Sequence, residues 1–133
     1  IRWLVDSFIK HSDIGCSLEM IEMDDLFSQE GQIIIYRIIQ ECLTNIAKHA
    51  QATIVSIIIK KQDDRIVFCV EDNGNGFNIQ EAFRKQTSKK GLGLAAMYQR
   101  TRMLGGDLDI RSQEGSGTRI TFTAPLDHGV YRQ

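Results

Sequence analysis

The sequence has little of several features that would otherwise narrow its class. Its 133 residues include one proline, and no apolar run approaches the roughly 18 residues that a membrane-spanning helix requires. No signal-peptide pattern opens the chain either. We therefore expect a cytoplasmic location, with any attachment to a membrane made only through segments upstream of this chain.

Cysteine is also scarce. The three cysteines, Cys16, Cys42 and Cys69, are odd in number and lack the CxxC spacing of zinc and redox sites. Each lies within a periodic apolar segment, which favours small buried thiols in a reducing compartment.

Neither sign of charge is in excess. Sixteen Lys plus Arg against seventeen Asp plus Glu leave a formal net charge of −1. The basic footprint of a nucleic-acid-binding protein is therefore missing, and any anionic ligand must be held locally. The pattern GxxxxGK[ST] of a P-loop nucleotide site is absent too. What is present, 42% hydrophobic and 25% charged residues, is typical of one soluble globular domain.

Hydrophobic periodicity predicts three helices and five strands. Apolar residues recur at helical spacing in segments 1–11, 28–50 and 94–104. The period-two alternation of strands occurs in segments 16–20, 53–61, 65–71, 108–110 and 120–124. Two antiparallel hairpins combined with helices predict an α+β fold. We expect a two-layer sandwich, with helices on one face of a mixed, mostly antiparallel sheet of about five strands. The chain begins at Ile1 rather than Met, partway into a helical pattern, which predicts a piece of a longer protein.

A row of polar side chains lies on the long predicted helix. Glu41, Asn45 and His49 are spaced by four residues. Lys48 is one turn from Asn45, so all four fall within an arc of about 100°. A solvated helix face explains this row if the helix stands alone. The same residue types also suit a metal–phosphate site, in which Asn45 offers a hard oxygen to Mg²⁺ and Glu41 orients water or a metal ligand. Lys48 or His49 would then meet phosphate oxygens.

The stretch Asp72-Asn-Gly-Asn-Gly76 follows directly after the predicted strand 65–71. Asn and Gly tolerate positive φ and end strands at little cost, so a simple turn explains it. The alternative is a ligand site, in which Asp72 accepts a hydrogen bond from an amino group. Gly74 and Gly76 would then let a flat ring or a sugar approach the backbone. An aspartate acceptor beside glycines suits the exocyclic amine of adenine.

Residues 78–90 are polar and basic and predict a mobile loop, with a possible helical turn at 80–83. Gly91 and Gly93 lead from this loop into the next helix, where backbone N–H groups and the helix dipole would face an anion. As a dinucleotide fingerprint these glycines are a weak match, because no strand precedes them.

Another glycine pair, Gly115 and Gly117, lies between the last two predicted strands and is most simply a hairpin turn. Thr118, which follows this pair, could still place a hydroxyl near Asp72 if their two strands are neighbours.

The order and spacing of these motifs are more specific than any one of them. They follow one another as Glu41-x-x-x-Asn45-x-x-Lys48-His49, Asp72-x-Gly74-x-Gly76, Gly91-x-Gly93-Leu94 and Gly115-x-Gly117-Thr118. Over about residues 16–126 the chain resembles the GHKL ATPase superfamily, with its asparagine box and glycine boxes. It looks most like the catalytic domains of sensor histidine kinases of the nitrate-sensor type. The resemblance implies the Bergerat type of α/β sandwich and a site for ATP and Mg²⁺.

Carried over position by position, the resemblance implies a role for each motif. The implied catalytic residues are Glu41, Asn45 and Lys48, with Asn45 as the Mg²⁺ ligand. Asp72 would take the adenine amino group, with Thr118 assisting through a water. The other implied nucleotide-binding residues are Lys48, His49, Gly74, Gly76, Lys89, Lys90, Gly91, Gly93 and Leu94. One departure is that the implied nucleotide lid has no Phe-rich box unless Phe83 serves.

The resemblance further implies an enzyme, a histidine protein kinase. It would transfer the γ-phosphoryl group of ATP to a histidine on a dimerisation helix that is absent from this chain. Residues 1–12 would be the end of that preceding helix or linker, and residues 13–133 the ATP-binding catalytic domain. The implied partners are this phosphoacceptor helix and a cognate response regulator, with no direct contact to nucleic acid.

Two other interpretations remain open. The same fold could serve as an ATP-gated conformational switch or as an anti-sigma serine kinase of the same superfamily, and transfer to a phosphoacceptor helix would distinguish these roles from the first. A non-enzymatic interaction module, in which every glycine only forms a turn, predicts a melting temperature that ignores ATP, ADP and their magnesium complexes.

Overall fold

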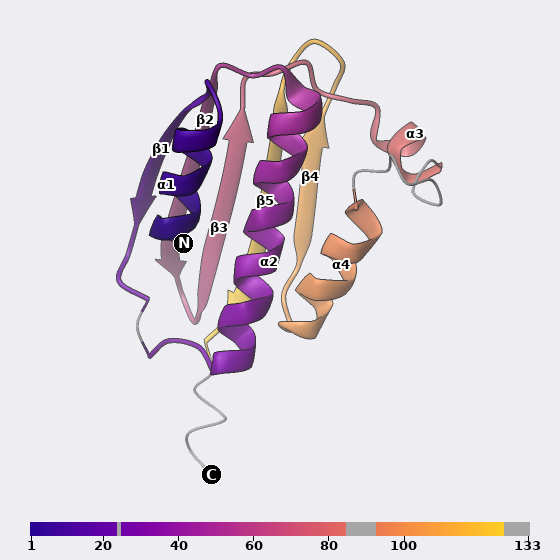
Figure 1. The fold of residues 1–133 in the computed structure, drawn as a ribbon. Helices are drawn as coiled ribbons and strands as arrows, with labels where there is room; N and C mark the ends of the chain where they lie inside the picture. Colours follow the sequence, from indigo (N-terminus) through magenta and orange to yellow (C-terminus); the bar gives the residue numbers. More distant parts are fainter. Residues whose placement is uncertain (24, 85–92, 127–133) are drawn as a thin grey trace.

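A five-stranded sheet forms one layer of the structure, a computed structural model that describes residues 1–23, 25–84 and 93–126 (Figure 1). The strands are β1 (Gly15–Met20), β2 (Ile54–Gln62), β3 (Arg65–Asp72), β4 (Leu108–Ser112) and β5 (Thr118–Pro125). They lie in the order β1-β2-β3-β5-β4, with β1 parallel to β2 and the other neighbours antiparallel. The predicted mixed, mostly antiparallel sheet is confirmed.

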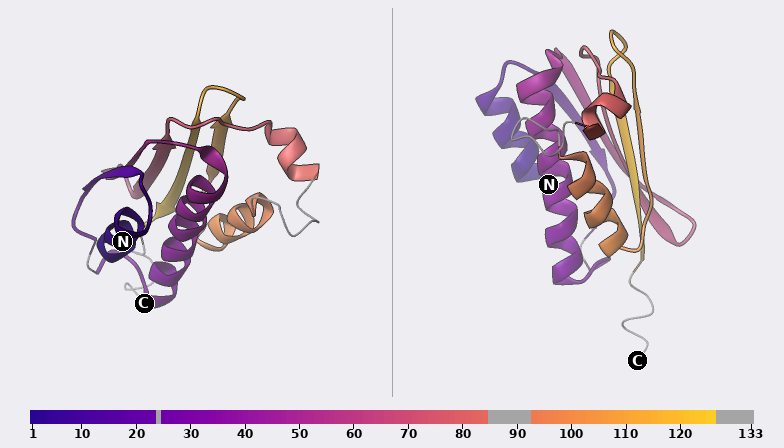
Figure 2. Two further views of the ribbon diagram at one scale, coloured as in Figure 1. Left: turned by 45° about the horizontal axis from the view of Figure 1, so that its top comes forward. Right: turned by 90° about the vertical axis from the view of Figure 1, so that its right-hand side faces the viewer.

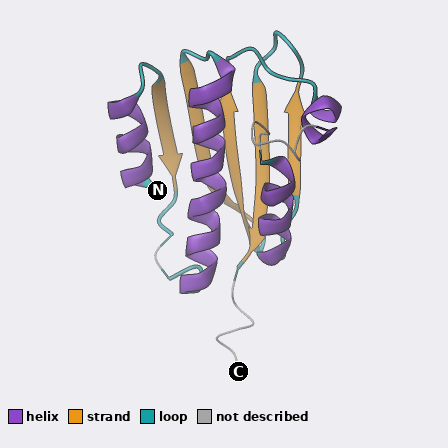
Figure 3. Ribbon diagram, turned by 45° about the vertical axis from the view of Figure 1, so that its right-hand side comes forward, coloured by secondary structure: helices purple, strands orange, loops and turns teal. Residues whose placement is uncertain are grey.

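The helices form the second layer. They are α1 (Arg2–His11), α2 (Gln29–Asn45) with the short π-helix η1 (Ile46–Ala50), α3 (Ile79–Arg84) and α4 (Leu94–Met103). Figure 2 shows α1, α2 and α4 on the same side of the sheet when the sheet is seen nearly edge-on. In Figure 3, α2 lies between α1 and α4 along the length of the sheet. The predicted two-layer α+β arrangement is therefore confirmed as well.

The core lies between the layers because the strands alternate apolar and polar side chains. Ile59 of β2, Phe68 of β3 and Phe122 of β5 face the helices and are at most 1% exposed. Phe68 and Phe122 stack with ring centroids 4.5 Å apart. The opposite face of the sheet carries polar pairs such as Arg119 and Glu71, whose charged groups are 2.9 Å apart. A solvated face of this kind is common for antiparallel sheets.

Helix α2 is held at its start by a side-chain cap and along its length by an apolar stripe. The Ser28 hydroxyl accepts a hydrogen bond from the Gly31 N–H at 3.0 Å, which satisfies one of the free donors of the first turn. The stripe that faces the sheet consists of Ile35, Ile38, Ile39, Cys42 and Leu43.

The long helix differs from the prediction at its C-terminal end. Instead of one α-helix reaching Ala50, the chain widens at Ile46 into the π-helical turn η1, and Gln51 then closes it with φ 52°. Such turns are rare and often lie at functional sites. Because a π-helix rotates less per residue than an α-helix, the side chains after Asn45 point in directions that a regular 100° step does not predict.

Smaller differences concern burial and the loop after β3. Cys42 is buried, but Cys16 and Cys69 are only half-buried, so the expectation of buried thiols is met fully by one cysteine. The helical turn considered at 80–83 within the expected loop 78–90 is present as α3, and residues 85–90 lie outside the described residues. No helix in the described part of the chain is long and apolar enough to cross a membrane.

Candidate functional site

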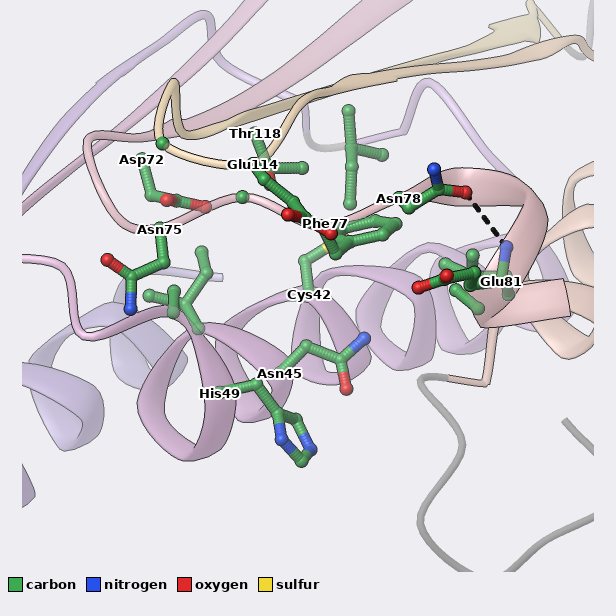
Figure 4. A pocket seen from close by; sticks show the side chains of 17 residues that line it. Cys42, Asn45, His49, Asp72, Asn75, Phe77, Asn78, Glu81, Glu114 and Thr118 are labelled. Atoms are coloured by element: carbon green, nitrogen blue, oxygen red, sulfur yellow. Dashed lines mark hydrogen bonds between the residues drawn. The ribbon is translucent and has the colours of Figure 1, made fainter. Parts of the chain in front are cut away.

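A cavity of about 540 Å³ opens where the C-terminal end of α2 faces the ends of β3 and β5. This volume lies within the range of small-molecule sites. Side chains from segments far apart in sequence line it: Cys42, Asn45 and His49 from α2 and η1, Asp72, Asn75, Phe77 and Asn78 from the end of β3 and the loop after it, Glu81 from α3, Leu94 from α4, and Glu114 and Thr118 from the β4–β5 hairpin. Figure 4 shows the helix below the cavity and the glycine-rich loops above it.

Asp72 is the buried charge of this cavity. It is the last residue of β3 and is only 7% exposed, and its Oδ1 accepts a hydrogen bond from the Gly74 N–H at 2.7 Å. Burial raises the pKa of its carboxyl, while hydrogen bonds from the backbone of Gly74 and Thr118 oppose this shift. A carboxylate held in this way can accept a hydrogen bond from a ligand's amino group inside the cavity.

The two glycines after Asp72 let the loop pack closely against its neighbours. A Cβ at Gly74 would overlap the carbonyl oxygen of Ala50, and the Asn75 N–H donates to that same oxygen at 2.7 Å. Gly76 has φ +68°, and a Cβ there would overlap the carbonyl oxygen of Gln113. Gly76 lines the cavity, whereas the space left by Gly74 is filled by protein. Both glycines therefore allow the loop to pack closely against protein backbone. The sequence alone could not distinguish this role from making room for a ligand.

Asn73 fastens the same loop to the start of β2. Its Oδ1 accepts from the N–H groups of Thr53 and Ile54 at 2.9 and 3.0 Å, and its Nδ2 donates to the Thr53 hydroxyl at 2.8 Å. Sequence reasoning assigned this residue to a turn and missed its role, because the partners lie 19 and 20 residues away along the chain.

The predicted row on α2 is brought only partly into the cavity. Asn45, the last residue of α2, and His49, in η1, both line it. Lys48 belongs to the same π-helical turn but is exposed and is not among the described residues that line the cavity. Figure 4 shows the side chains of Asn45 and His49 together on one wall of the cavity, across from Asp72 and Thr118.

Glu41 lies against the start of α4 rather than in the cavity lining. Gly93, with φ +69°, precedes that helix, and a Cβ on Gly93 would lie 2.7 Å from Glu41 Oε1. Leu94, the first residue of α4, is 1% exposed and lines the cavity. The N-terminus of α4 is therefore next to the α2 row. The predicted residues Lys89, Lys90 and Gly91 lie outside the described residues.

The residues that line the cavity without having been singled out from the sequence include Phe77, Asn78, Glu81 and Glu114. The Phe77 ring lies in the middle of the cavity, and Asn78 Oδ1 accepts from the Glu81 N–H at 3.0 Å at the start of α3 (Figure 4). Their only sequence signal is that each lies within a few residues of a glycine motif.

The fold and the cavity define a class of protein. A mixed sheet of this order, with helices on one face and a cavity between the central helix and the glycine loops, is an α/β sandwich of the Bergerat type. Residues 30–128 match the family described as histidine kinase-, DNA gyrase B-, and HSP90-like ATPase, and the chain belongs to this family. The family predicted from the motif order is thereby confirmed.

Several curated relatives are sensor kinases. The chain is 34% identical over 128 residues to the signal transduction histidine-protein kinase/phosphatase DegS of Brevibacillus brevis, a match that covers 95% of this chain and 31% of DegS. It is 33% identical over 100 residues to the oxygen sensor histidine kinase NreB of Staphylococcus carnosus, covering 75% of this chain and 28% of NreB. The chain thus spans about a third of the length of these relatives.

Solved structures show the same fold. The blue-light activated histidine kinase EL346 of Erythrobacter litoralis superposes with a TM-score of 0.77 at 20% identity, covering 98% of this chain and 42% of that chain. The mycobacterial sensor histidine kinase MprB superposes with a TM-score of 0.71 at 22% identity, covering 94% of this chain and 93% of that chain. The match with MprB spans nearly all of the chain in that solved structure.

Proposed function

We propose that this chain is the catalytic domain of a two-component sensor histidine kinase. It binds ATP with Mg²⁺ and delivers the γ-phosphoryl group to a histidine on a dimerisation helix outside this chain. The observation that carries the proposal is the set of polar groups that line one cavity. Its helical wall carries an amide and an imidazole, from Asn45 and His49, and its sheet wall carries a buried carboxylate and a hydroxyl, from Asp72 and Thr118.

The sheet wall supports recognition of the base. Asp72 Oδ1 already accepts one backbone N–H, and an ionised carboxylate has room for further donors, so it can accept from the exocyclic amine of adenine. Thr118 is paired with Asp72 across β3 and β5, so the two side chains leave the same face of the sheet, which supports a joint role at the base. Replacing Asp72 should therefore weaken ATP and ADP to a similar degree.

The helical wall supports the phosphates and the metal. Asn45 offers an amide oxygen, which is the kind of ligand that Mg²⁺ takes in proteins. No cluster of three His, Cys, Asp or Glu residues that could hold a metal occurs within the described residues. A magnesium ion carried largely by nucleotide phosphates needs only one or two protein ligands, so the donor set fits. A bound Mg²⁺ would supply neutralising charge at the phosphate oxygens.

The N-terminus of α4 offers a second anion-binding feature at the same wall. Its helix has ten residues and begins directly after Gly93, beside Glu41, so the positive end of the helix dipole lies close to the α2 row. We assign nucleotide binding to Leu94 at this helix start and to Lys48 and His49 in η1. Lys89, Lys90 and Gly91, which precede α4 in the sequence, complete the proposed phosphate set.

The partners and boundaries of the domain follow from the same proposal. The partners are the phosphoacceptor helix of the full-length protein and a response regulator, and the domain works on the cytoplasmic side. We keep residues 13–133 as the catalytic domain and residues 1–12 as the end of the preceding segment. Leu4 and Val5 of α1 are buried in the core, so this preceding segment is packed onto the domain.

Nucleotide titration of the 133-residue chain tests binding. We expect the wild type to bind ATP and ADP, Asp72→Asn to lose most affinity for both, and Asn45→Ala to lose only the part that requires Mg²⁺. Two matched controls should leave affinity unchanged: Asp109→Asn, an exposed acid paired with Arg111 on β4, and Gln40→Ala, an exposed amide on α2. Binding that is untouched by Asp72→Asn would refute the assignment of the base site.

Phosphoryl transfer needs a separate assay. The chain is mixed with a dimerisation-helix fragment of a related kinase, and labelled ATP is added. Acid-labile, alkali-stable labelling of the helix supports transfer to histidine. Hydrolysis without labelling, in a chain that binds ATP, would indicate instead an ATP-driven switch on the same fold.

A further inference from the structure

Ser112, the last residue of β4, lies outside every motif that the sequence predicts, yet three parts of the site meet at its hydroxyl. Its Oγ accepts a hydrogen bond from the Phe77 N–H at 2.9 Å and donates to the Gly117 carbonyl oxygen at 3.2 Å. It also lies 2.7 Å from Thr118 Oγ1, and either hydroxyl can be the donor of that bond. One half-buried side chain thus ties the loop after β3 to both strands of the β4–β5 hairpin.

The strand register places Ser112 in line with the proposed base-recognition residues. Ser112 pairs with Thr118 between β4 and β5, and Thr118 pairs with Asp72 between β5 and β3. Directly paired residues point to the same face of a sheet. Ser112, Thr118 and Asp72 therefore form one transverse row across three strands, on the face that carries the helices.

The hydrogen atoms available at Ser112 limit what Thr118 can do. A serine hydroxyl has one donor and two acceptor sites, and the Phe77 N–H occupies one acceptor site. If the Ser112 hydrogen goes to Gly117, the remaining acceptor site takes the Thr118 hydrogen, and Thr118 then offers only lone pairs to the cavity. If the Ser112 hydrogen goes to Thr118, the Thr118 hydrogen is directed elsewhere. Only the first arrangement keeps all three hydrogen bonds, because the Gly117 carbonyl requires the Ser112 hydrogen, and in it Thr118 can only accept on the cavity side.

We infer that Ser112 is a positioning residue for recognition of the nucleotide base, because it sets the direction of the Thr118 hydroxyl beside Asp72 and anchors the backbone of Phe77. It acts through these residues and lines neither wall of the cavity itself. Thr118 and the Phe77 ring, through which Ser112 would act, both border the space into which Asp72 points (Figure 4). The inference rests on the proposed function and adds to it the residue that organises the base edge.

The test compares ATP with GTP, whose six-membered ring presents the opposite donor and acceptor pattern at its edge. Both are titrated against the 133-residue chain at the same Mg²⁺ concentration. Ser112→Ala should weaken ATP about tenfold, the equivalent of one to two hydrogen bonds, and should change GTP by less than about twofold. The ratio of ATP affinity to GTP affinity should then fall about tenfold. Ser112→Thr, which restores the hydroxyl, should recover the wild-type preference.

Two further variants serve as an alternative substitution and as a control. Ser112→Cys retains the side-chain volume but has only a weak hydrogen-bonding group, so it should also narrow the preference even if Ser112→Ala folds poorly. Ser116→Ala removes an exposed hydroxyl from the same hairpin and should leave both affinities unchanged.

The outcomes separate the inference from the proposed function. If the wild type prefers ATP and Ser112→Ala weakens ATP and GTP by the same factor, Ser112 only supports the fold and the inference is overturned. Failure of Ser112→Thr to restore the preference overturns it as well. A wild type that binds neither nucleotide overturns the proposed function and this inference with it.

Discussion

Gly115 and Gly117 lie two residues apart in the β4–β5 hairpin, and the structure predicts very different costs for giving each a side chain. Both have positive φ, +86° and +78° respectively, so alanine is strained at either position by about 1 kcal/mol or a little more. At Gly115 no heavy atom lies within 4 Å of an added Cβ. At Gly117 the added Cβ would overlap the carbonyl oxygen of Asp72 and lie 3.4 Å from the Cα of Asn73.

The overlap at Gly117 is with backbone atoms, which cannot rotate aside as a flexible side chain can. The end of β3 would have to move, and forced overpacking of this kind costs typically 1–3 kcal/mol in addition to the strain. Gly115→Ala should therefore destabilise by about 1 kcal/mol and Gly117→Ala by about 3 kcal/mol. With an unfolding entropy of about 2.1 cal/mol/K per residue, these correspond to melting temperatures lower by about 4 °C and about 10 °C.

Thermal unfolding of the nucleotide-free chain, followed by circular dichroism or calorimetry, measures the difference directly. The informative quantity is the gap between the two variants, because both share the same φ strain, hairpin and composition change. Equal losses would show that strain alone sets the cost and that the hairpin is not packed against the end of β3 as described. Moving the end of β3 also displaces Asp72, so Gly117→Ala should bind ATP weakly even at low temperature, where the variant is folded. Wild-type ATP affinity in that variant would argue against the displacement.

Three further outcomes are expected. Burial raises the pKa of Asp72, so ATP affinity should fall as the pH is lowered, beginning at pH values above the usual aspartate range. In the nucleotide-free chain at pH 7, Asp72→Asn should raise the melting temperature, because it removes a buried charge, and should abolish the rise in stability that the wild type shows as the pH falls. Burial raises the pKa of the Cys42 thiol to about 12, so a thiol reagent should modify Cys69 in the native protein and reach Cys42 only on unfolding. Asn73→Ala removes three hydrogen bonds and should cost about 2–3 kcal/mol in chemical denaturation, against about 1 kcal/mol for Asn75→Ala, which removes one side-chain bond.

The sheet and the helices could be predicted because their signals are local. Alternating residues such as those of β2 and β3 must put Ile59 and Phe68 on one face, and the stripe on α2 must face that side. The end of α2 could not be predicted in the same way. The last residue of the π-helical turn, Ala50, accepts a hydrogen bond from the N–H of Asn75, which lies 25 residues further along the chain.

The residues of the candidate site likewise fall into those with a local sequence signal and those whose position depends on distant parts of the chain. Asp72 and Asn45 could be found because their motifs place chemistry at a strand end and a helix end, and both do line one cavity. Lys48 was predicted on one helix face with Asn45 by assuming a regular helix, and it lies in the wider turn, exposed and outside the described lining. Ser112 had no motif at all, because its importance comes from partners that lie 5, 6 and 35 residues away.

The two walls of the cavity should respond differently to substitution, because they are built differently. Asp72 and Thr118 belong to paired strands, and the loops beside them are locked to each other through backbone contacts of Gly76 and Gly117. A change at that wall therefore alters the packed sheet before any ligand arrives, and its effect should appear in the stability of the free protein. Asn45 and His49 line the cavity from the end of a helix and are not part of the buried core, so their truncation should leave the core intact. Variants that lose nucleotide affinity and leave the stability of the free protein unchanged should consequently map to the helical wall.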